Sequence, residues 1–392
     1  MLTRLLVSLY GFAFFNKFLL LTPVYSIFML QNGLTDLQLS TMFIVSAVAT
    51  IFGQMPIAFL TNHIGQRYSM IFGQFLKIVA VILWLFWPTY FGFVIGMILW
   101  GLQTGFRSVA FEGLLYDSVS ANGMGDEYTR ILGRKSTYES IGVALSAFGS
   151  LLMFLGYGWV TWLSVAAIVM SIICLLMIKY TPPKHIRAKT VPFRKLFRTG
   201  MRVCLQIPCL LTTMVLALLA ANIPYLDDFL SPIGLQLGIP TEYIGFMSLF
   251  LLGCATVGQR FAYKFKNMSD RFIYFAIAAV GMSYMIFGLI YKVGFLWLLG
   301  IGYILFYGTY TLLYSRLQHM IPSRHRSVVL SLYTTINYCI YIAVCGIVGL
   351  GSMMGSWRYS IVILGTLLLF VFCWAIAQVS NKCPLLQFED ED

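Results

Sequence analysis

Twelve apolar stretches separated by short loops account for most of this chain of 392 residues. Crossing about 30 Å of hydrocarbon takes roughly 20 residues of helix, and each stretch approaches or exceeds that length. Only 10% of the residues are charged, against roughly 25% in ordinary globular chains. In lipid every backbone polar group must be satisfied within the protein, which helices achieve on their own. The sequence therefore predicts an all-α polytopic membrane protein.

The predicted transmembrane helices are placed by the apolar stretches themselves, with short Gly, Pro, Asn and Thr punctuation between them. We expect twelve spans, at approximately residues 5–30, 37–61, 68–87, 90–120, 128–155, 158–180, 207–236, 241–263, 271–291, 294–317, 325–350 and 357–380.

The basic residues fall on one side of the predicted membrane. Of the 26 Lys and Arg residues, all except five lie at the inner ends of spans or in inner loops. Basic loops resist translocation, so we expect a multi-pass protein of the cell inner membrane with both termini in the cytoplasm. The exceptions are Lys292 and Arg358 on the outer side, and Lys17, Lys77 and Arg107 within apolar stretches.

The two halves of the sequence share a register. At one constant offset Gly33, Met42, Gly53 and Gln54 match Gly238, Met247, Gly258 and Gln259. This pattern indicates two parallel six-helix pseudo-repeats. The predicted organisation is a bundle at 1–180, a basic cytoplasmic linker at 181–206, a second bundle at 207–380 and a cytoplasmic acidic tail at 381–392.

Proline occupies equivalent places in the two halves, because Pro23 lies toward the outer end of the first span and Pro224 toward the outer end of the seventh. Interrupted helices at corresponding positions point to a substrate path. The alternative is that proline is simply common in membrane helices.

The loop between the second and third spans carries a motif. Its sequence, AFLTNHIGQR at residues 58–67, resembles the signature of the major facilitator superfamily. Gly65 and Arg67 match that signature, whereas Ala58, Asn62 and Gln66 replace the usual Gly, Asp and basic residue.

A second motif, FEGLLYD at residues 111–117 with Gly133 and Arg134 following, is similar to the fourth and fifth helices of bacterial members. The resemblance implies a cavity lined by helices 1, 2, 4, 5, 7, 8, 10 and 11. It also implies a cytoplasmic gating network at Asn62, Gly65, Arg67, Asp117 and Arg134. The Gly-Pro signature of drug antiporters is absent from the fifth span.

Charged residues inside the apolar stretches are candidates for function. A charge at the bilayer centre costs roughly 2.5–3.5 kcal/mol on insertion scales, so Lys17, beside Asn16, should face water or the bundle interior. We interpret Lys17 as a cation of the substrate cavity, with a structural ion pair as the alternative. Lys77 lies on the third span, outside the cavity-lining set, and structural pairing is expected there.

Arg107 on the fourth span and Glu139 on the fifth reach similar depths at 1.5 Å per residue, which predicts that they pair. Such a pair neutralises two costly charges, but an acid that gains and loses a cation partner also suits proton coupling. Glu112 and Glu139 are the candidates for that role, and Arg107 joins the candidate cavity.

Small residues accompany these acids and predict close packing of the fourth and fifth helices. They are Gly101, Gly105 and Ser108 on the fourth span, and Gly142, Ser146 and Gly149 on the fifth.

An aromatic stripe runs along the tenth span, where Tyr303, Tyr307, Tyr310 and Tyr314 recur at helical spacing. It suits either helix packing or a substrate wall. We assign Tyr303, Tyr307 and Tyr310 to the cavity, with Asn337 and Tyr338 of the eleventh span. Asp227 and Asp228 are expected at the outer mouth as solvated residues, with a gate as the alternative.

These features together predict a secondary active transporter, not an enzyme, that moves a small organic solute by alternating access with H⁺ as the coupling ion. An anionic or zwitterionic substrate, such as an organic acid, siderophore or metabolite, fits Lys17 and Arg107. The alternatives are a proton-coupled multidrug efflux pump and a non-transporting membrane receptor or membrane-embedded enzyme. The chain is expected to be monomeric in the lipid bilayer, without cofactor, metal or nucleic acid, because no such motif is present.

Overall fold

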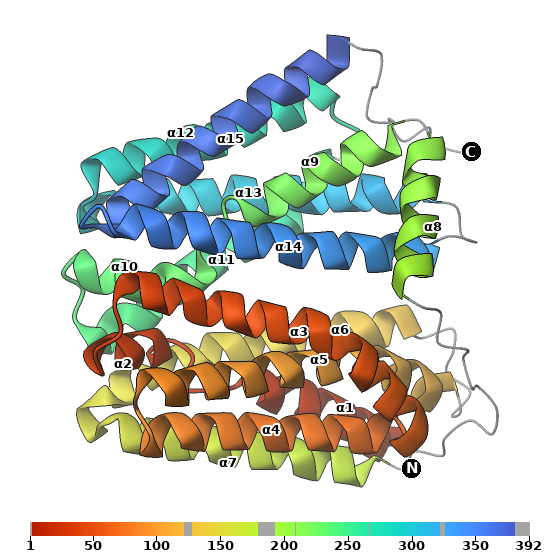
Figure 1. Cartoon of the computed structure of the whole chain (residues 1–392), viewed down its shortest axis with the longest axis vertical. Helices are drawn as coiled ribbons and strands as arrows, with labels where there is room; N and C mark the ends of the chain where they lie inside the picture. The colour runs from red at the N-terminus through yellow and green to blue at the C-terminus, as the bar shows by residue number, and fades with distance from the viewer. Residues whose placement is uncertain are drawn as a thin grey trace. The chain divides into compact units, whose positions relative to one another are not determined.

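The computed structural model describes residues 2–120, 128–178, 193–207, 209–265, 267–321 and 326–380. Within these ranges the chain is helical and contains no strand (Figure 1). Contacts divide the chain into two compact units, which are Met1–Thr190 with Pro240–Ser248, and Val191–Ile239 with Leu249–Asp392.

The first unit contains most of the helices of the amino-terminal half. They are α1 (Leu2–Lys17), α2 (Tyr25–Gln31), α3 (Asp36–Ile64), α4 (Gln66–Phe86), α5 (Tyr90–Ser120), α6 (Tyr128–Ser146) and α7 (Tyr157–Met177), with short 3-10 turns η2 (Ala147–Gly149) and η3 (Leu151–Leu155).

The remaining elements begin with α8 (Phe193–Gln206). They continue with α9 (Leu210–Asn222), η4 (Asp227–Phe229), α10 (Leu230–Gln236), η5 (Thr241–Tyr243), α11 (Ile244–Ala262), η6 (Tyr263–Phe265), α12 (Asp270–Ile290), η7 (Val293–Phe295), α13 (Leu296–Met320), α14 (Arg326–Ser352) and α15 (Trp357–Ser380).

Ten stretches of the described residues are long and apolar enough to cross a membrane. They correspond to ten of the twelve predicted spans, and the first and fifth are the two that do not meet this criterion. The first is split into α1 and α2, and its apolar part Leu5–Lys17 is short. In the fifth, α6 carries Arg130, Arg134, Lys135 and Glu139, which make it much less apolar than the other long helices.

Both helices that contain the equivalent prolines are interrupted, as predicted. Helix α1 ends at Lys17 and α2 begins at Tyr25, with Pro23 in the non-helical segment between them. Helix α9 ends at Asn222, and Pro224 follows before helical structure resumes in η4. Proline lacks the backbone N–H that an uninterrupted helix needs, so each interruption has a local cause.

Local sequence signals set the boundary between α3 and the segments around it. Thr35 begins the helix with a reciprocal capping box, in which its hydroxyl accepts from the Gln38 amide and its own amide donates to the Gln38 side chain. Gly65 separates α3 from α4 with a φ of 86°, a backbone conformation that favours glycine.

The small-residue faces of α5 and α6 do not pack against each other, so the predicted close packing of these two helices is wrong. The Gly101 face of α5 lies against α3, where a side chain at Gly101 would overlap the Ser46 carbonyl. The Gly142 face of α6 lies against α1, where an added Cβ would be 2.6 Å from the Phe14 carbonyl oxygen. Each glycine therefore allows close contact with a different helix from the expected one.

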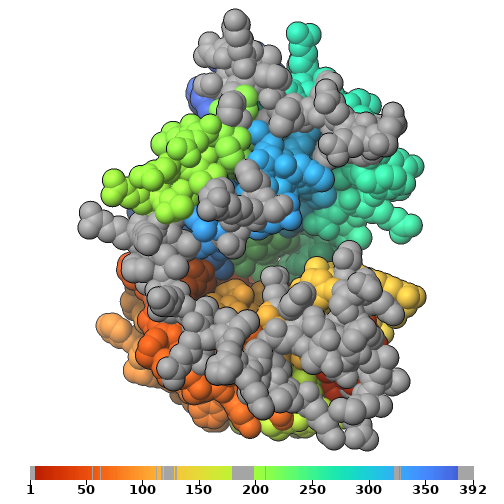
Figure 2. Space-filling model, turned by 90° about the vertical axis from the view of Figure 1, so that its right-hand side faces the viewer, coloured from red at the N-terminus to blue at the C-terminus, as the bar shows by residue number. Residues whose placement is uncertain are grey.

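Helix α8 occupies the end of the predicted linker 181–206 and packs across α14 (Figures 1 and 2). Its Val203 and Cys204 are buried, whereas Arg198 and Arg202 are exposed. The helix is thus amphipathic and presents basic residues away from α14.

All eight Cys residues lie within spans or toward the inner side in the sequence, which predicts no disulfide framework. Cys209, just after α8, is nevertheless disulfide-bonded.

Candidate functional site

A buried polar network surrounds the end of α1, where the first span is interrupted. The Lys77 ammonium donates to the Asn16 carbonyl oxygen at 2.8 Å and lies 3.3 Å from Asn16 Oδ1. Gln74 Nε2 donates to the same Oδ1 at 3.1 Å, and the Ser171 hydroxyl donates to Gln74 Oε1 at 3.2 Å. All four side chains are buried. The network therefore links α1, α4 and α7 at one level.

Lys77 has the structural role that the sequence predicts, but its hydrogen-bond acceptors are a backbone carbonyl and an amide. The carbonyl of Asn16 is at the carboxyl end of α1, where helical carbonyls lack intrahelical partners and where a cation is favoured by the helix dipole. The ammonium also lies 5.3 Å from the centroid of the Trp100 ring, in cation–π range. Lys77 thus stabilises the interruption of the first span.

Three cations of the first unit lie close enough to act on one another. The charges of Lys17 and Arg107 both bear electrostatically on Lys77. Counting from the first residue of each helix at 1.5 Å per residue, Lys77 and Glu139 lie at about 16–17 Å along α4 and α6, and Lys17 lies at about 22 Å along α1. The first unit therefore places positive charge well inside its long helices.

The predicted contact between Arg107 and Glu139 is present in the structure. Arg107 Nη1 lies 3.9 Å from Glu139 Oε1, and Lys135 Nζ lies 3.2 Å from Glu139 Oε2. The arginine side chain is 29% exposed and that of the glutamate 17%. Glu139 is therefore shared by two cations, and one acid does not neutralise both.

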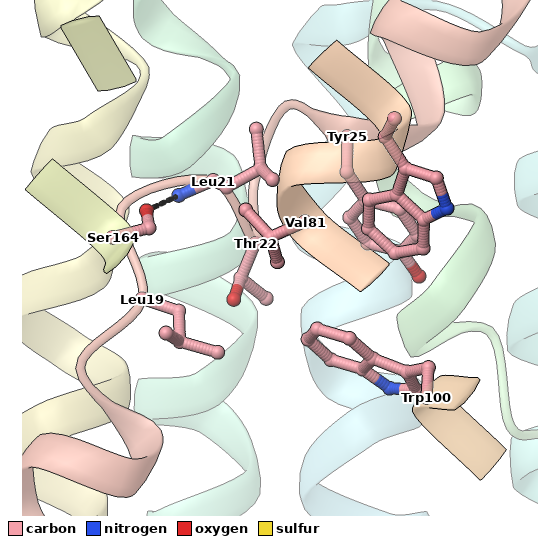
Figure 3. A pocket seen from close by; sticks show the side chains of 8 residues that line it. Leu19, Leu21, Thr22, Tyr25, Val81, Trp100 and Ser164 are labelled. Carbon is pink, nitrogen blue, oxygen red and sulfur yellow. Dashed lines mark hydrogen bonds between the residues drawn. The ribbon is translucent and has the colours of Figure 1, made fainter. Parts of the chain in front are cut away.

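A small apolar pocket adjoins the interruption of the first span (Figure 3). Leu19, Leu21 and Thr22 of the non-helical segment form one side, and Trp100 lies across from them (Figure 3). The Leu21 amide donates to the Ser164 hydroxyl at 2.9 Å, which fixes the segment to α7. The pocket has a volume of about 20 Å³, far below the usual range of ligand pockets of about 300–1,000 Å³.

In the second unit, Asp227 follows the interruption of the seventh span and is held by two phenols. The Tyr303 hydroxyl donates to Asp227 Oδ1 at 2.8 Å, and the Tyr307 hydroxyl donates to Oδ2 at 2.7 Å. Both tyrosines project from α13, one helical turn apart. Asp227 itself is exposed, whereas Tyr303 is buried. Both carboxylate oxygens are therefore engaged at a place that solvent reaches.

Further hydrogen bonds tie the same interruption to two other helices. The Tyr341 hydroxyl of α14 donates to Asp228 Oδ2 at 2.7 Å, and the Tyr284 hydroxyl of α12 donates to the Pro224 carbonyl oxygen at 2.6 Å. At the end of α9, Asn222 Nδ2 donates to Asn337 Oδ1 at 2.8 Å. We refer to residues 222–228 and these partners as the polar clasp.

The phenol partners of Asp227 lie well inside α13. Tyr303 and Tyr307 are about 10 and 16 Å along this helix from its first residue, Leu296. The chain is not helical at 223–226, so counting residues along a continuous seventh helix does not give these partners. The expected place of Asp227 at the outer mouth stays a prediction.

The predicted tyrosine stripe divides into two parts. Tyr303 and Tyr307 belong to the polar clasp, whereas the Tyr310 and Tyr314 rings stack with centroids 5.8 Å apart. Tyr314 also packs against Tyr333 of α14, at 5.4 Å. Tyr310 and Tyr314 therefore pack against other aromatic rings, and the assignment of Tyr310 to the cavity stays a prediction. Tyr338 of α14 is partly buried.

The predicted gating residues lie at one end of the first unit. Arg67 donates from Nε to the Leu175 carbonyl at 3.0 Å and from Nη2 to the Leu176 carbonyl at 2.5 Å, so it caps the carboxyl end of α7. Arg134 is exposed on α6. The side chains of Asn62, Glu112 and Asp117 lie outside the described residues. Their roles stay predictions, as do those of Gly65, Arg67 and Arg134.

Metal ligation finds no support in the part of the chain that the structure describes. No group of three or more His, Cys, Asp or Glu side chains is gathered there in a way that could hold a metal ion.

The apolar helices and the two interrupted spans define a multi-pass membrane protein with the architecture of a transporter. The chain belongs to the Major Facilitator Superfamily, whose sequence model matches residues 6–345. Membership of this family identifies it as a membrane transporter. No curated protein matches its sequence.

Solved structures of transporters are similar to this chain over nearly their whole length. The nucleoside transporter NupG has a TM-score of 0.72 at 12% identity, covering 97% of this chain and 99% of that chain. A POT family transporter in complex with 5-aminolevulinic acid has a TM-score of 0.70 at 13% identity, covering 96% of each chain. A D-xylose-proton symporter has a TM-score of 0.70 at 13% identity, covering 94% of this chain and 96% of that chain. At these identities the similarity establishes the fold alone.

Proposed function

We propose that this protein is a secondary active transporter that moves a small anionic or zwitterionic organic solute across the cell inner membrane by alternating access, coupled to protons. The observation that carries the proposal is the group of cations, Lys17, Lys77 and Arg107, that the first unit holds beside an interrupted helix. In transporters, substrate sites near the midplane are formed by such discontinuous helices. A negatively charged substrate group offsets the cost of holding these cations in the membrane.

The charge balance of the first unit supports an anionic group on the substrate. Its predicted membrane interior contains three cations, Lys17, Lys77 and Arg107, and two acids, Glu112 and Glu139. Glu139 is shared by Arg107 and Lys135. A carboxylate or phosphate on the substrate brings this part of the protein closer to neutrality.

The polar clasp supports a zwitterion more than a simple anion. Asp227 is exposed and accepts hydrogen bonds from two phenols, which leaves lone pairs of its carboxylate oxygens for a further donor. An amino group is such a donor. An amino group on the solute therefore has a candidate partner in Asp227, as an acidic group has in the cations of the first unit, and Asn16 and Asn337 are further candidate hydrogen-bonding groups.

A second candidate function, proton-coupled efflux of amphipathic cations, is favoured by the same Asp227 and its tyrosines. Aromatic rings beside a carboxylate attract organic cations. The two candidates differ in the charge of the transported solute. Under either one, Glu112 and Glu139 are the proposed proton-coupling acids, and the gating residues of the first unit control cytoplasmic opening.

The charge preference is tested with the purified full-length chain in liposomes adsorbed on a solid-supported membrane. Concentration jumps of amino acids, dicarboxylates, sugars and quaternary amines are applied, and the transport currents are recorded. We expect currents with anionic or zwitterionic solutes that Lys17→Gln abolishes and Lys17→Arg retains, while Lys292→Gln at an exposed outer position changes nothing. Currents with quaternary amines alone overturn this proposal and establish the second candidate.

A further inference from the structure

The interruption of the seventh span is fixed by side chains that all approach from other helices. Hydroxyls of Tyr303 and Tyr307 on α13, Tyr341 on α14 and Tyr284 on α12 each donate to an acceptor in residues 224–228. The donors are phenols, and the acceptors are two carboxylates and one backbone carbonyl. The segment that joins α9 to η4 is thus held in place by side-chain bonds from its surroundings.

Among these bonds, the pair at Asp227 depends on the charge of the acceptor. An ionised carboxylate only accepts hydrogen bonds, whereas a protonated one gains an O–H donor and loses acceptor capacity on that oxygen. Each phenol donates to a different oxygen of Asp227. When one oxygen takes up a proton, its phenol must turn away or become an acceptor, so the two bonds are not both kept in their present form.

The surroundings of Asp227 also suit exchange of a proton with water. Part of the residue's surface is exposed, although its carboxyl group lies among the surrounding side chains. The titratable groups that face it are Tyr303 and Tyr307 of α13, Tyr284 of α12, and Asp228 with its partner Tyr341 of α14. Within the described residues of this unit, no Lys, Arg or His forms an ion pair with Asp227. The negative charge of Asp227 is therefore neutralised either by a proton or by a bound ligand.

We propose that Asp227 is a protonation site of the second unit, and that uptake of a proton there opens the polar clasp and releases residues 222–228. The proton comes from water and binds to one carboxylate oxygen. No other covalent bond is made or broken. The phenol on that oxygen then turns away or accepts a hydrogen bond from the new O–H, and residues 222–228 gain freedom to move relative to α13. This inference rests on the proposed proton coupling and adds a second acid to the candidates of the first unit.

Proton binding is measured directly by infrared difference spectroscopy on the full-length chain in lipid, titrated with buffer and no substrate. Acidification is expected to produce the carbonyl stretch of a protonated carboxyl group, and Asp227→Asn is expected to remove that component. Glu242→Gln, at an exposed acid outside the clasp, is the matched control, which leaves the component in place. A component of undiminished size in Asp227→Asn overturns the assignment.

Release of the segment is measured by hydrogen–deuterium exchange at a single pH at which the wild-type carboxylate is ionised. Asp227→Asn imitates the neutral acid, and Tyr307→Phe removes one phenol while keeping the charge. Loss of one hydrogen bond to a charged group predicts exchange in residues 222–228 that is roughly tenfold faster in both variants. Tyr314→Phe, on the same helix but outside the clasp, should match wild type. Wild-type exchange in Asp227→Asn and Tyr307→Phe contradicts the release.

Neither measurement contains a transported solute. A failure of the proposed substrate class therefore leaves these results unaffected, and a negative result at Asp227 leaves the transport assay with Lys17 variants to be judged on its own.

Discussion

The ammonium of Lys77 lies 2.8 Å from the carbonyl oxygen of Asn16, at the point where the first span stops being helical. The two residues are on different helices, and both are buried. A buried lysine is costly in a membrane, and here its charge is directed at a helix end whose carbonyls lack intrahelical partners. The interruption of the helix frees the Asn16 carbonyl, and this carbonyl accepts a hydrogen bond from the buried Lys77 ammonium.

Replacing Lys77 with Met is expected to destabilise the protein, because the Asn16 carbonyl then loses a buried donor. An unsatisfied buried polar group costs about 1–3 kcal/mol, which lowers the apparent melting temperature of the purified protein followed by tryptophan fluorescence. Lys292→Met, at an exposed outer position, provides the control. Equal melting temperatures for the two variants would show that the Lys77 ammonium does not stabilise the helix end.

Glu139→Gln is expected to separate binding from coupling. The glutamine keeps the shape of the side chain but cannot carry the charge that Arg107 and Lys135 share. A proton gradient should then no longer drive accumulation of the solute, while exchange of labelled for unlabelled solute continues. Both are measured in proteoliposomes, with Glu242→Gln, an exposed acid, as the control. Gradient-driven accumulation in Glu139→Gln at the wild-type level rules out Glu139 as a coupling acid.

Much of this arrangement could be predicted from local sequence alone. The apolar stretches place the helices because the bilayer requires a certain length of helix, and Pro23 and Pro224 mark both interruptions because proline lacks a donor. The contact between Arg107 and Glu139 follows from counting 1.5 Å per residue along continuous helices.

The remaining contacts could not be predicted, because they depend on how the chain runs once a helix is broken. The depth of Asp227 cannot be counted through residues that are not helical, so its phenol partners were missed although Tyr303 and Tyr307 were singled out. The acceptor of Lys77 is a backbone atom, which no side-chain pattern reveals. The glycines of α5 and α6 correctly indicate close helix packing, but the sequence does not show which helix each of them packs against.

Gly149→Ala is expected to disturb the join between η2 and the interrupted first span. An added Cβ would overlap the carbonyl oxygen of Leu20, and backbone cannot move aside as a flexible side chain does. Overpacking of this kind costs about 1–3 kcal/mol, measurable as a lower apparent melting temperature. Gly158→Ala, which meets no atom within 4 Å, is the matched control and should be neutral or slightly stabilising. A Gly149→Ala protein as stable as Gly158→Ala contradicts this close contact.

Arg316→Met is expected to be the most destabilising of these substitutions. Arg316 Nη1 lies 2.7 Å from Asp270 Oδ1, with side chains only 1% and 13% exposed, and Nη2 donates to the Met268 carbonyl at 2.6 Å. Removing one partner of a buried pair typically costs about 3–5 kcal/mol, because the other charge is left uncompensated. Asp270→Asn in the Arg316→Met background should therefore recover part of the loss, and Arg271→Met, at the exposed neighbour, should have little effect. Melting temperatures of the single and double variants decide this, since strictly additive losses would show that Arg316 and Asp270 stabilise the protein independently.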